Sequence, residues 1–159
     1  CKLIFKIIII VIMEIIFNKV NEDFIRNLSN LNFTDEIREK FYEVCYALYL
    51  NMKEFYNNEE IPVSHYVYFL IENDIIVGCC SFYCNHDTKF SELFALYIDK
   101  EFRRRHLTYK IISKLLVFFK EQNIQNIKTN QINYWMKANY IMIDIMYYCG
   151  YNTEVDSVS

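Results

Sequence analysis

Residues 92–120 read ELFALYIDKEFRRRHLTYKIISKLLVFFK and contain two apolar patterns of different period. Residues 93–98 are apolar without a break, which is typical of a strand that is covered on both faces. From Leu107 onward the apolar residues recur every three or four positions, with lysines between them. That spacing predicts an amphipathic helix that buries one face. We therefore expect this stretch to run from a buried strand into a helix.

A charged loop, residues 99–106, joins the two patterns and holds the three consecutive arginines Arg103, Arg104 and Arg105. The first turn of a helix presents N–H groups without helical partners, and the helix dipole favours negative charge there. A strand that leads through a cationic loop into a helix therefore predicts a site for an anion such as a phosphate group.

The stretch resembles the central motif of the GNAT family of acyl-CoA-dependent N-acyltransferases. In that motif a strand and a short acidic loop lead into Arg/Gln-x-x-Gly-x-Gly/Ala at the start of a helix. Residues 103–108, RRRHLT, match the motif at Arg103 and carry His106 and Thr108 at its two glycine positions. Side chains there add bulk where the family brings its backbone close to the phosphates. The resemblance implies that the phosphates of acetyl-CoA are bound by Arg103, Arg104, Arg105, His106, Leu107 and Thr108.

The resemblance also implies where the rest of the cofactor and a catalytic base lie. In the family, the pantetheine arm pairs with the backbone at the end of this strand, which here is Leu96 and Ile98. Glu92 lies eleven positions before the first arginine of the loop. That offset matches the carboxylate that some members use to deprotonate the amine, usually through water. An apolar strand around a buried carboxylate makes it a stronger base. By side-chain type alone, His65 and His86 are alternatives.

Residues 139–151 resemble the second motif of the family, Asn-x-x-Ala-x-x-Leu-Tyr-x-x-x-Gly-Phe. Asn139 matches the Asn, which implies a place beside the cofactor, and Gly150 matches the Gly. Met146 stands where many members have the tyrosine that protonates the leaving thiolate. Tyr147 is the neighbouring candidate for this acid, although one position on a helix turns a side chain by about 100°.

Composition limits the class of protein. A length of 159 residues suits one domain with a core, and 53% hydrophobic residues argue against disorder. A net charge of −3 disfavours a general nucleic-acid binder. The six cysteines include no repeated CxxC pair and no His/Cys ligand spacing, so we expect no metal site and reduced thiols in a cytoplasmic protein.

Residues 3–12 are apolar apart from Lys6, and three interpretations stay open. They are a short membrane-directed segment, a signal peptide without a small-residue cleavage site, and sequence upstream of a start at Met13. We expect the last, with residues 1–12 as an extension and the domain at residues 13–155.

Apolar periodicity along residues 13–155 predicts the element order βααβββαβαβ. A GNAT domain shows this order, which implies an α+β fold with three α/β/α layers. Its central sheet is mixed and mostly antiparallel, with helices on both faces. Strands 75–83 and 90–98 are expected to pair antiparallel, and Gly78 indicates a bulge or a close approach. The predicted strands are 14–20, 64–72, 75–83, 90–98, 127–132 and 151–155, and the predicted helices are 22–31, 35–52, 105–122 and 139–148.

These observations favour an N-acyltransferase that uses acetyl-CoA or a related acyl-CoA as co-substrate. The resemblance implies direct attack by a primary amine, of a small molecule or a protein, in a ternary complex. Partners other than acyl-CoA and this amine are not expected: no nucleic acid and no membrane, in a monomer or homodimer. The alternative is a catalytically degenerate GNAT-fold protein that acts as a protein-interaction module, which the absent glycines and tyrosine favour.

Binding of acetyl-CoA separates the two interpretations. We expect weakened but measurable binding, stronger at pH 6 than at pH 8, because a protonated His106 would favour a phosphate. His106→Gly should raise the affinity at pH 8 by removing side-chain bulk. Calorimetric titration measures both. No binding at millimolar acetyl-CoA, with no gain in the variant, would contradict the enzyme interpretation.

Overall fold

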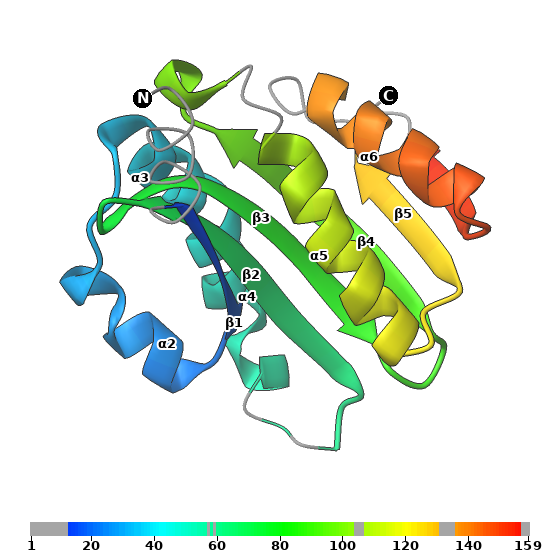
Figure 1. Ribbon diagram of the computed structural model, residues 1–159. Coiled ribbons are helices and arrows are strands. Elements are labelled where there is room, and N and C mark those ends of the chain that lie inside the picture. The colour runs from blue at the N-terminus through cyan, green and yellow to red at the C-terminus, as the bar shows by residue number, and fades with distance from the viewer. Residues whose placement is uncertain (1–12, 57, 59, 104–106, 131–135, 157–159) are drawn as a thin grey trace.

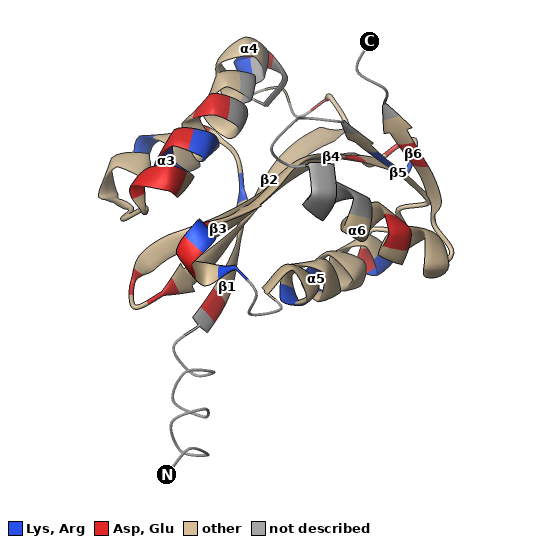
Figure 2. Ribbon diagram, turned by 90° about the horizontal axis from the view of Figure 1, so that it is seen from above, with Lys and Arg blue, Asp and Glu red and all other residues tan. Residues whose placement is uncertain are grey.

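The protein, seen here as a computed structural model, is described over residues 13–56, 58, 60–103, 107–130 and 136–156. Its centre is one six-stranded sheet in which the strands lie side by side in chain order, from β1 to β6. Helices α3 and α4 cover one face of the sheet, and α5 and α6 cover the other (Figures 1 and 2). The three-layer α+β fold is therefore confirmed, whereas residues 1–12 lie outside the described part of the chain.

Every predicted helix and strand is present, with boundaries that differ by a few residues. The first predicted helix is divided at Asn27, the second contains a π-helical turn, and the last begins three residues earlier than predicted. The strands are β1 (Met13–Lys19), β2 (Val63–Glu72), β3 (Ile75–Asn85), β4 (Phe90–Ile98), β5 (Asn126–Asn130) and β6 (Asn152–Asp156). The helices are α2 (Glu22–Arg26), η1 (Leu28–Asn30), α3 (Asp35–Phe41), η2 (Tyr42–Tyr46), α4 (Ala47–Tyr56), η3 (Lys100–Phe102), α5 (Leu107–Glu121) and α6 (Met136–Tyr148).

Local chemistry explains the element boundaries. The side chains of Asn21 and Thr34 each accept a hydrogen bond from the backbone N–H three positions on, at 2.9 and 3.3 Å. Both therefore act as N-caps, Asn21 of α2 and Thr34 of α3. Asn73 and Asp74 have positive φ angles of 50° and 64°, which a two-residue hairpin loop requires. This tight turn joins β2 to β3.

The pairing changes direction across the sheet. Strands β1 to β4 pair antiparallel, as expected for β3 and β4, while β4–β5 and β5–β6 pair parallel. Gly78 lies beside a register shift between β2 and β3. A Cβ atom at Gly78 would lie 3.1 Å from the Tyr97 carbonyl oxygen and 3.3 Å from the Leu70 Cβ atom. The close approach predicted from this glycine is therefore confirmed.

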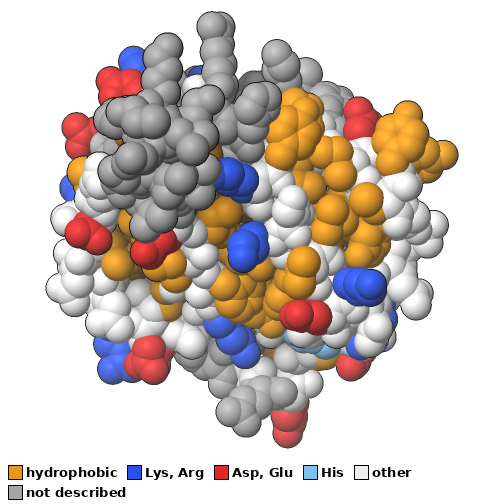
Figure 3. All heavy atoms as spheres, in the orientation of Figure 1, with side chains coloured by type: hydrophobic (Ala, Val, Ile, Leu, Met, Phe, Trp, Pro, Cys, Tyr) orange, Lys and Arg blue, Asp and Glu red, His pale blue; other side chains and the backbone are white. Residues whose placement is uncertain are grey.

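Each face of the sheet has its own apolar core. Phe82, Leu115 and Phe119 are fully buried between the sheet and α5–α6. Ile37 and Phe41 of α3 are buried on the opposite face. The outer surface of α5 and α6 also carries apolar side chains (Figure 3), and Tyr109, Val117, Tyr147 and Tyr148 are each more than half exposed. No helix of the described residues is long and apolar enough to cross a membrane.

The five described cysteines are free thiols. Cys45 and Cys79 are buried in the core under α3–α4, and Cys80 and Cys84 in the core under α5–α6. Burial raises the pKa of the Cys45 and Cys84 thiols to about 12. Cys149 is exposed. The buried thiols therefore stay protonated and behave as small apolar side chains.

One polar pair is fully buried in the sheet. His65 of β2 and Ser81 of β3 have no exposed surface, and His65 Nε2 lies 2.6 Å from Ser81 Oγ. Burial lowers the pKa of His65 to about 3. The imidazole is therefore neutral at physiological pH, with one ring nitrogen as a donor and the other as an acceptor.

Two residues of α5 test the core. Leu115→Ala should lower the free energy of unfolding by about 2–5 kcal/mol, because a fully buried leucine leaves a cavity. Val117→Ala, two positions on and 57% exposed, should change it by less than about 0.5 kcal/mol. Urea denaturation followed by circular dichroism measures both. Equal effects would contradict the assigned inner face of α5.

His65 should make stability depend on acidity. Because its folded pKa of about 3 lies below the ordinary value of 6.5, the unfolded chain binds more protons between these values. Stability is therefore lost as the pH falls from about 6.5 towards 3. Between pH 6 and pH 5 the wild type should lose about 1 kcal/mol more than His65→Gln, which cannot titrate. Urea unfolding at both pH values measures this, and parallel losses would contradict it.

Candidate active site

Strand β4 separates from β5 before it ends. It pairs with β3 as far as Ile98, but the parallel ladder with β5 stops at Leu93 and Thr129. Within the described residues, positions 94–98 have no partner in β5. Because Leu96 and Ile98 lie in this segment, part of their backbone faces an open edge inside the sheet. This open edge lies at Leu96 and Ile98, where the pantetheine arm is expected to pair.

Helix α5 begins beside the open end of β4. Leu107, its first residue, is buried against Leu70, Val77 and Ile98. Thr108 follows in the first turn and is half-buried. The N–H groups of this turn are the donors expected to meet a phosphate. Arg104, Arg105 and His106 lie outside the described residues.

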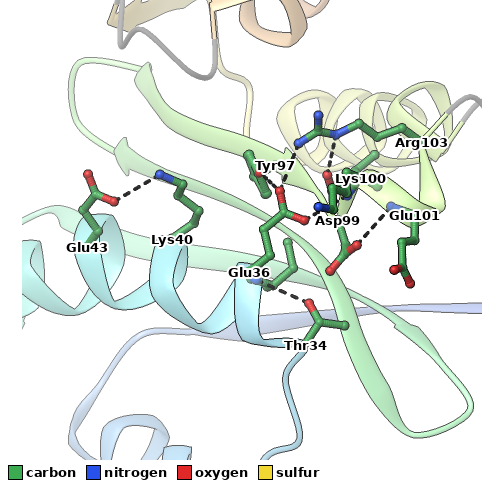
Figure 4. A network of polar contacts seen from close by, with 11 residues as sticks. Thr34, Glu36, Lys40, Glu43, Tyr97, Asp99, Lys100, Glu101 and Arg103 are labelled. Carbon is green, nitrogen blue, oxygen red and sulfur yellow. Dashed lines mark hydrogen bonds and ion pairs between the residues drawn. The ribbon is translucent and has the colours of Figure 1, made fainter.

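The Arg103 side chain reaches toward Glu36 of α3 (Figure 4). Its Nε–H donates to the Ile98 carbonyl at 2.8 Å, and its NH2 group lies 3.4 Å from Glu36. The guanidinium carbon lies 4.9 Å from the centre of the Tyr97 ring. Three contacts therefore hold this side chain, although it is about half exposed. The predicted phosphate contact of Arg103 stays a prediction.

Glu36 is the centre of the polar network in Figure 4. Its carboxylate accepts hydrogen bonds from the Tyr97 hydroxyl and from the Lys100 backbone N–H, the latter at 3.0 Å, besides its contact with Arg103. Burial raises the pKa of Tyr97 to about 12, and the hydrogen bond to Glu36 acts in the same direction. Tyr97 is therefore a neutral donor. Sequence reasoning missed Glu36, which lies far from the loop in the chain.

Glu92 lies on the face of the sheet that α3 and α4 cover. Its carboxylate accepts a hydrogen bond from the Tyr83 hydroxyl of β3 at 2.6 Å. The Tyr83 ring lies 5.1 Å from that of Phe94, which is buried. Glu92 is half-buried and comes one residue before the last β4–β5 pair at Leu93. The structure therefore places this carboxylate where the two strands part, and Tyr83 is a second residue that the sequence did not single out.

The remaining candidates are spread over the fold. His65 is the buried neutral residue described above, and its ring lies 5.8 Å from that of Phe94. His86 follows β3, half-buried, with its Nε2 atom 3.2 Å from the Tyr66 hydroxyl oxygen. Burial lowers the pKa of His86, and nearby lysines add to this shift.

The two candidates on α6 remain untested as site residues. Asn139 lies in α6, and its side chain is outside what the structure describes. Tyr147 is 65% exposed and meets Tyr148 edge to face, whereas Met146, at the motif position, is fully buried. The hydroxyl of Tyr147 is thus on the solvent side of the helix. No group of three potential metal ligands occurs among the described residues.

Comparison with known proteins identifies the fold and the family. The chain superposes on an aminoglycoside acetyltransferase from an uncultured soil metagenomic sample, in complex with sisomicin, with a TM-score of 0.56 and 14% identity over 95% of both chains. For the ribosomal-protein-alanine N-acetyltransferase of Brucella melitensis biovar Abortus 2308, the TM-score is 0.54 and the identity 11%, over 92% of this chain and 96% of that one.

A third similar structure is AAC(6')-Iy in complex with the bisubstrate analogue CoA-S-monomethyl-acetylneamine. Its TM-score is 0.53 with 12% identity, over 92% of this chain and 95% of that one. No curated protein sequence matches the chain significantly. The model of the acetyltransferase (GNAT) family matches residues 23–140, which is most of the chain. This protein therefore belongs to the GNAT family of acetyltransferases.

Proposed function

We propose that this protein is an N-acyltransferase that moves an acetyl or related acyl group from acyl-CoA to a primary amine. The observation that carries the proposal is the opening between β4 and β5. It leads from the half-buried carboxylate of Glu92 to the first turn of α5. An extended thioester needs a base near its carbonyl, backbone partners along its arm and donors at its phosphates. Glu92, the end of β4 and the first turn of α5 would supply them in that order.

The cofactor arm would lie along β4. The backbone of Leu96 and Ile98 would pair with its amide groups, and N–H groups on the open edge would polarise the thioester carbonyl. The phosphates would meet the first turn of α5 and the Thr108 hydroxyl, with charge supplied by Arg104 and Arg105. The similar structure of AAC(6')-Iy with a CoA-containing bisubstrate analogue supports this class of co-substrate.

Glu92 would act as the base, directly or through water. The carboxylate takes a proton from the ammonium group, and the free amine nitrogen attacks the thioester carbonyl carbon. The tetrahedral intermediate then expels the CoA thiolate as the C–S bond breaks. The attacking nitrogen loses one proton to give the amide, and this proton balances the one that the thiolate takes up. The Tyr83 hydroxyl, at 2.6 Å, would orient the carboxylate toward the amine. Tyr147 stays the sequence-based candidate for the acid, although its exposure does not favour that role.

An interaction module is the second candidate, and the contacts of Arg103 favour it. An arginine whose donors already serve Ile98 and Glu36 offers fewer to a phosphate. The exposed apolar side chains of α5 and α6 would then serve a protein partner. Binding of acetyl-CoA by the wild type decides between the two candidates.

Glu92→Gln tests the base. Loss of the basic group should lower kcat/KM by about 10²–10⁴-fold while the acetyl-CoA dissociation constant stays unchanged. Release of CoA thiol, measured with a chromogenic thiol reagent against a panel of amines, aminoglycosides and peptides, gives the rates. Calorimetry gives the affinity.

Glu121→Gln is the matched control, because it removes an exposed carboxylate at the end of α5. It should leave both quantities unchanged. Full activity of Glu92→Gln toward an amine that the wild type acetylates would contradict the assigned base. Absence of thiol release with every amine, in a protein that binds no acetyl-CoA, would contradict the proposed function.

A further inference from the structure

Glu36 has the properties of a residue that positions the loop before α5. Its carboxylate accepts hydrogen bonds from Tyr97, Lys100 and Arg103 (Figure 4). These three residues lie at the end of β4, at the start of η3 and just after η3. We propose that Glu36 is a positioning residue for the acyl-CoA site. It holds the segment of residues 97–103 against α3, so that the first turn of α5 stays beside the open end of β4. The inference rests on the function proposed above.

The loop is fixed at several points besides Glu36. The Asp99 backbone N–H donates to the Val77 carbonyl at 2.8 Å, and the Asp99 carboxylate accepts from the Glu101 N–H at 3.0 Å. The Arg103 Nε–H closes the segment back onto the Ile98 carbonyl at 2.8 Å. These bonds tie the loop to itself and to β3. The bonds to Glu36 tie it to α3.

Glu36 stands on a rigid support. It is the second residue of α3, which Thr34 caps, and a carboxylate in the first turn of a helix is favoured by the helix dipole. The start of α3 is bonded to β3, because the Thr34 N–H donates to the Ile76 carbonyl and the Ile76 N–H to the Asn32 carbonyl, at 3.1 and 2.8 Å. Ile37, the next residue, is fully buried. Because α3 is fixed to the sheet in these ways, the Glu36 carboxylate is a fixed acceptor for the segment of residues 97–103.

Positioning and simple electrostatics predict opposite effects of removing Glu36. A negative charge near the phosphates repels them, so a purely electrostatic role predicts tighter binding when the charge is lost. A positioning role predicts weaker binding, because a loosened loop must be ordered again when the cofactor binds. Arg103 would then act through the shape of the loop, since its contacts go to Ile98, Glu36 and Tyr97.

Calorimetric titration of the full chain with acetyl-CoA distinguishes the two roles. Glu36→Ala should lower the affinity on the order of tenfold, as expected for the loss of a charged hydrogen-bond acceptor. Glu36→Gln keeps an oxygen that accepts the Lys100 N–H and should restore most of it. Glu39→Ala is the control, because Glu39 carries the same charge on the exposed side of α3 and should change affinity by less than about twofold.

Amide hydrogen exchange without cofactor gives the second readout. The Lys100 N–H should exchange faster in Glu36→Ala than in the wild type, Glu36→Gln or Glu39→Ala. If the wild type binds acetyl-CoA and Glu36→Ala binds it equally well or better, the inference is overturned and the proposed function stands. If the wild type binds none, the proposed function fails, while faster exchange in Glu36→Ala alone still supports Glu36 as the residue that holds the loop.

Discussion

The rest of the structure depends on the place where β4 leaves β5. The last parallel pair joins Leu93 to Thr129, and the Thr129 hydroxyl donates to the Leu93 carbonyl at 3.3 Å. The next residue, Phe94, is the extra residue of a bulge against β3. A bulge bends its strand and increases the local twist. Because the bulge lies where the β4–β5 ladder ends, β4 bends away from β5 at this point. It keeps its hydrogen bonds to β3 as far as Ile98, so the β3–β4 pairing at the middle of the sheet is preserved.

The polar candidates of the site and the start of α5 lie on opposite faces of the sheet. Glu92, Tyr83, His65 and Ser81 are grouped on the side that α3 and α4 cover, whereas α5 starts on the opposite side. A reaction that joins two substrates benefits from entry on two sides, because each can reach the reacting atoms without displacing the other. Under the proposed function, Glu92 would face the amine and the first turn of α5 would face the phosphates.

Local signals in the sequence predicted the fold well. Side-chain contacts between residues far apart in the chain could not be predicted from such signals. The caps Asn21 and Thr34 and the hairpin turn at Asn73 depend on residues a few positions apart, so a single sequence contains them. The bond between Tyr83 and Glu92 depends on the register of β3 and β4, which the bulge shifts. The contact of Arg103 with Glu36 joins residues 67 positions apart. The motif indicated where this arginine lies but not where its side chain turns.

The buried cysteine thiols can be used as probes of local opening of the fold. A thiol reagent needs a thiolate that it can reach, so among the five described cysteines Cys149, on the surface, should be modified first. Cys45 and Cys79 become accessible only when the layer of α3 and α4 lifts from the sheet, and Cys80 and Cys84 only when that of α5 and α6 does. Mass spectrometry shows the order in which these cysteines are alkylated in the native protein. That order reports which helical layer opens first by local unfolding, and so which face of the sheet has the lower local stability.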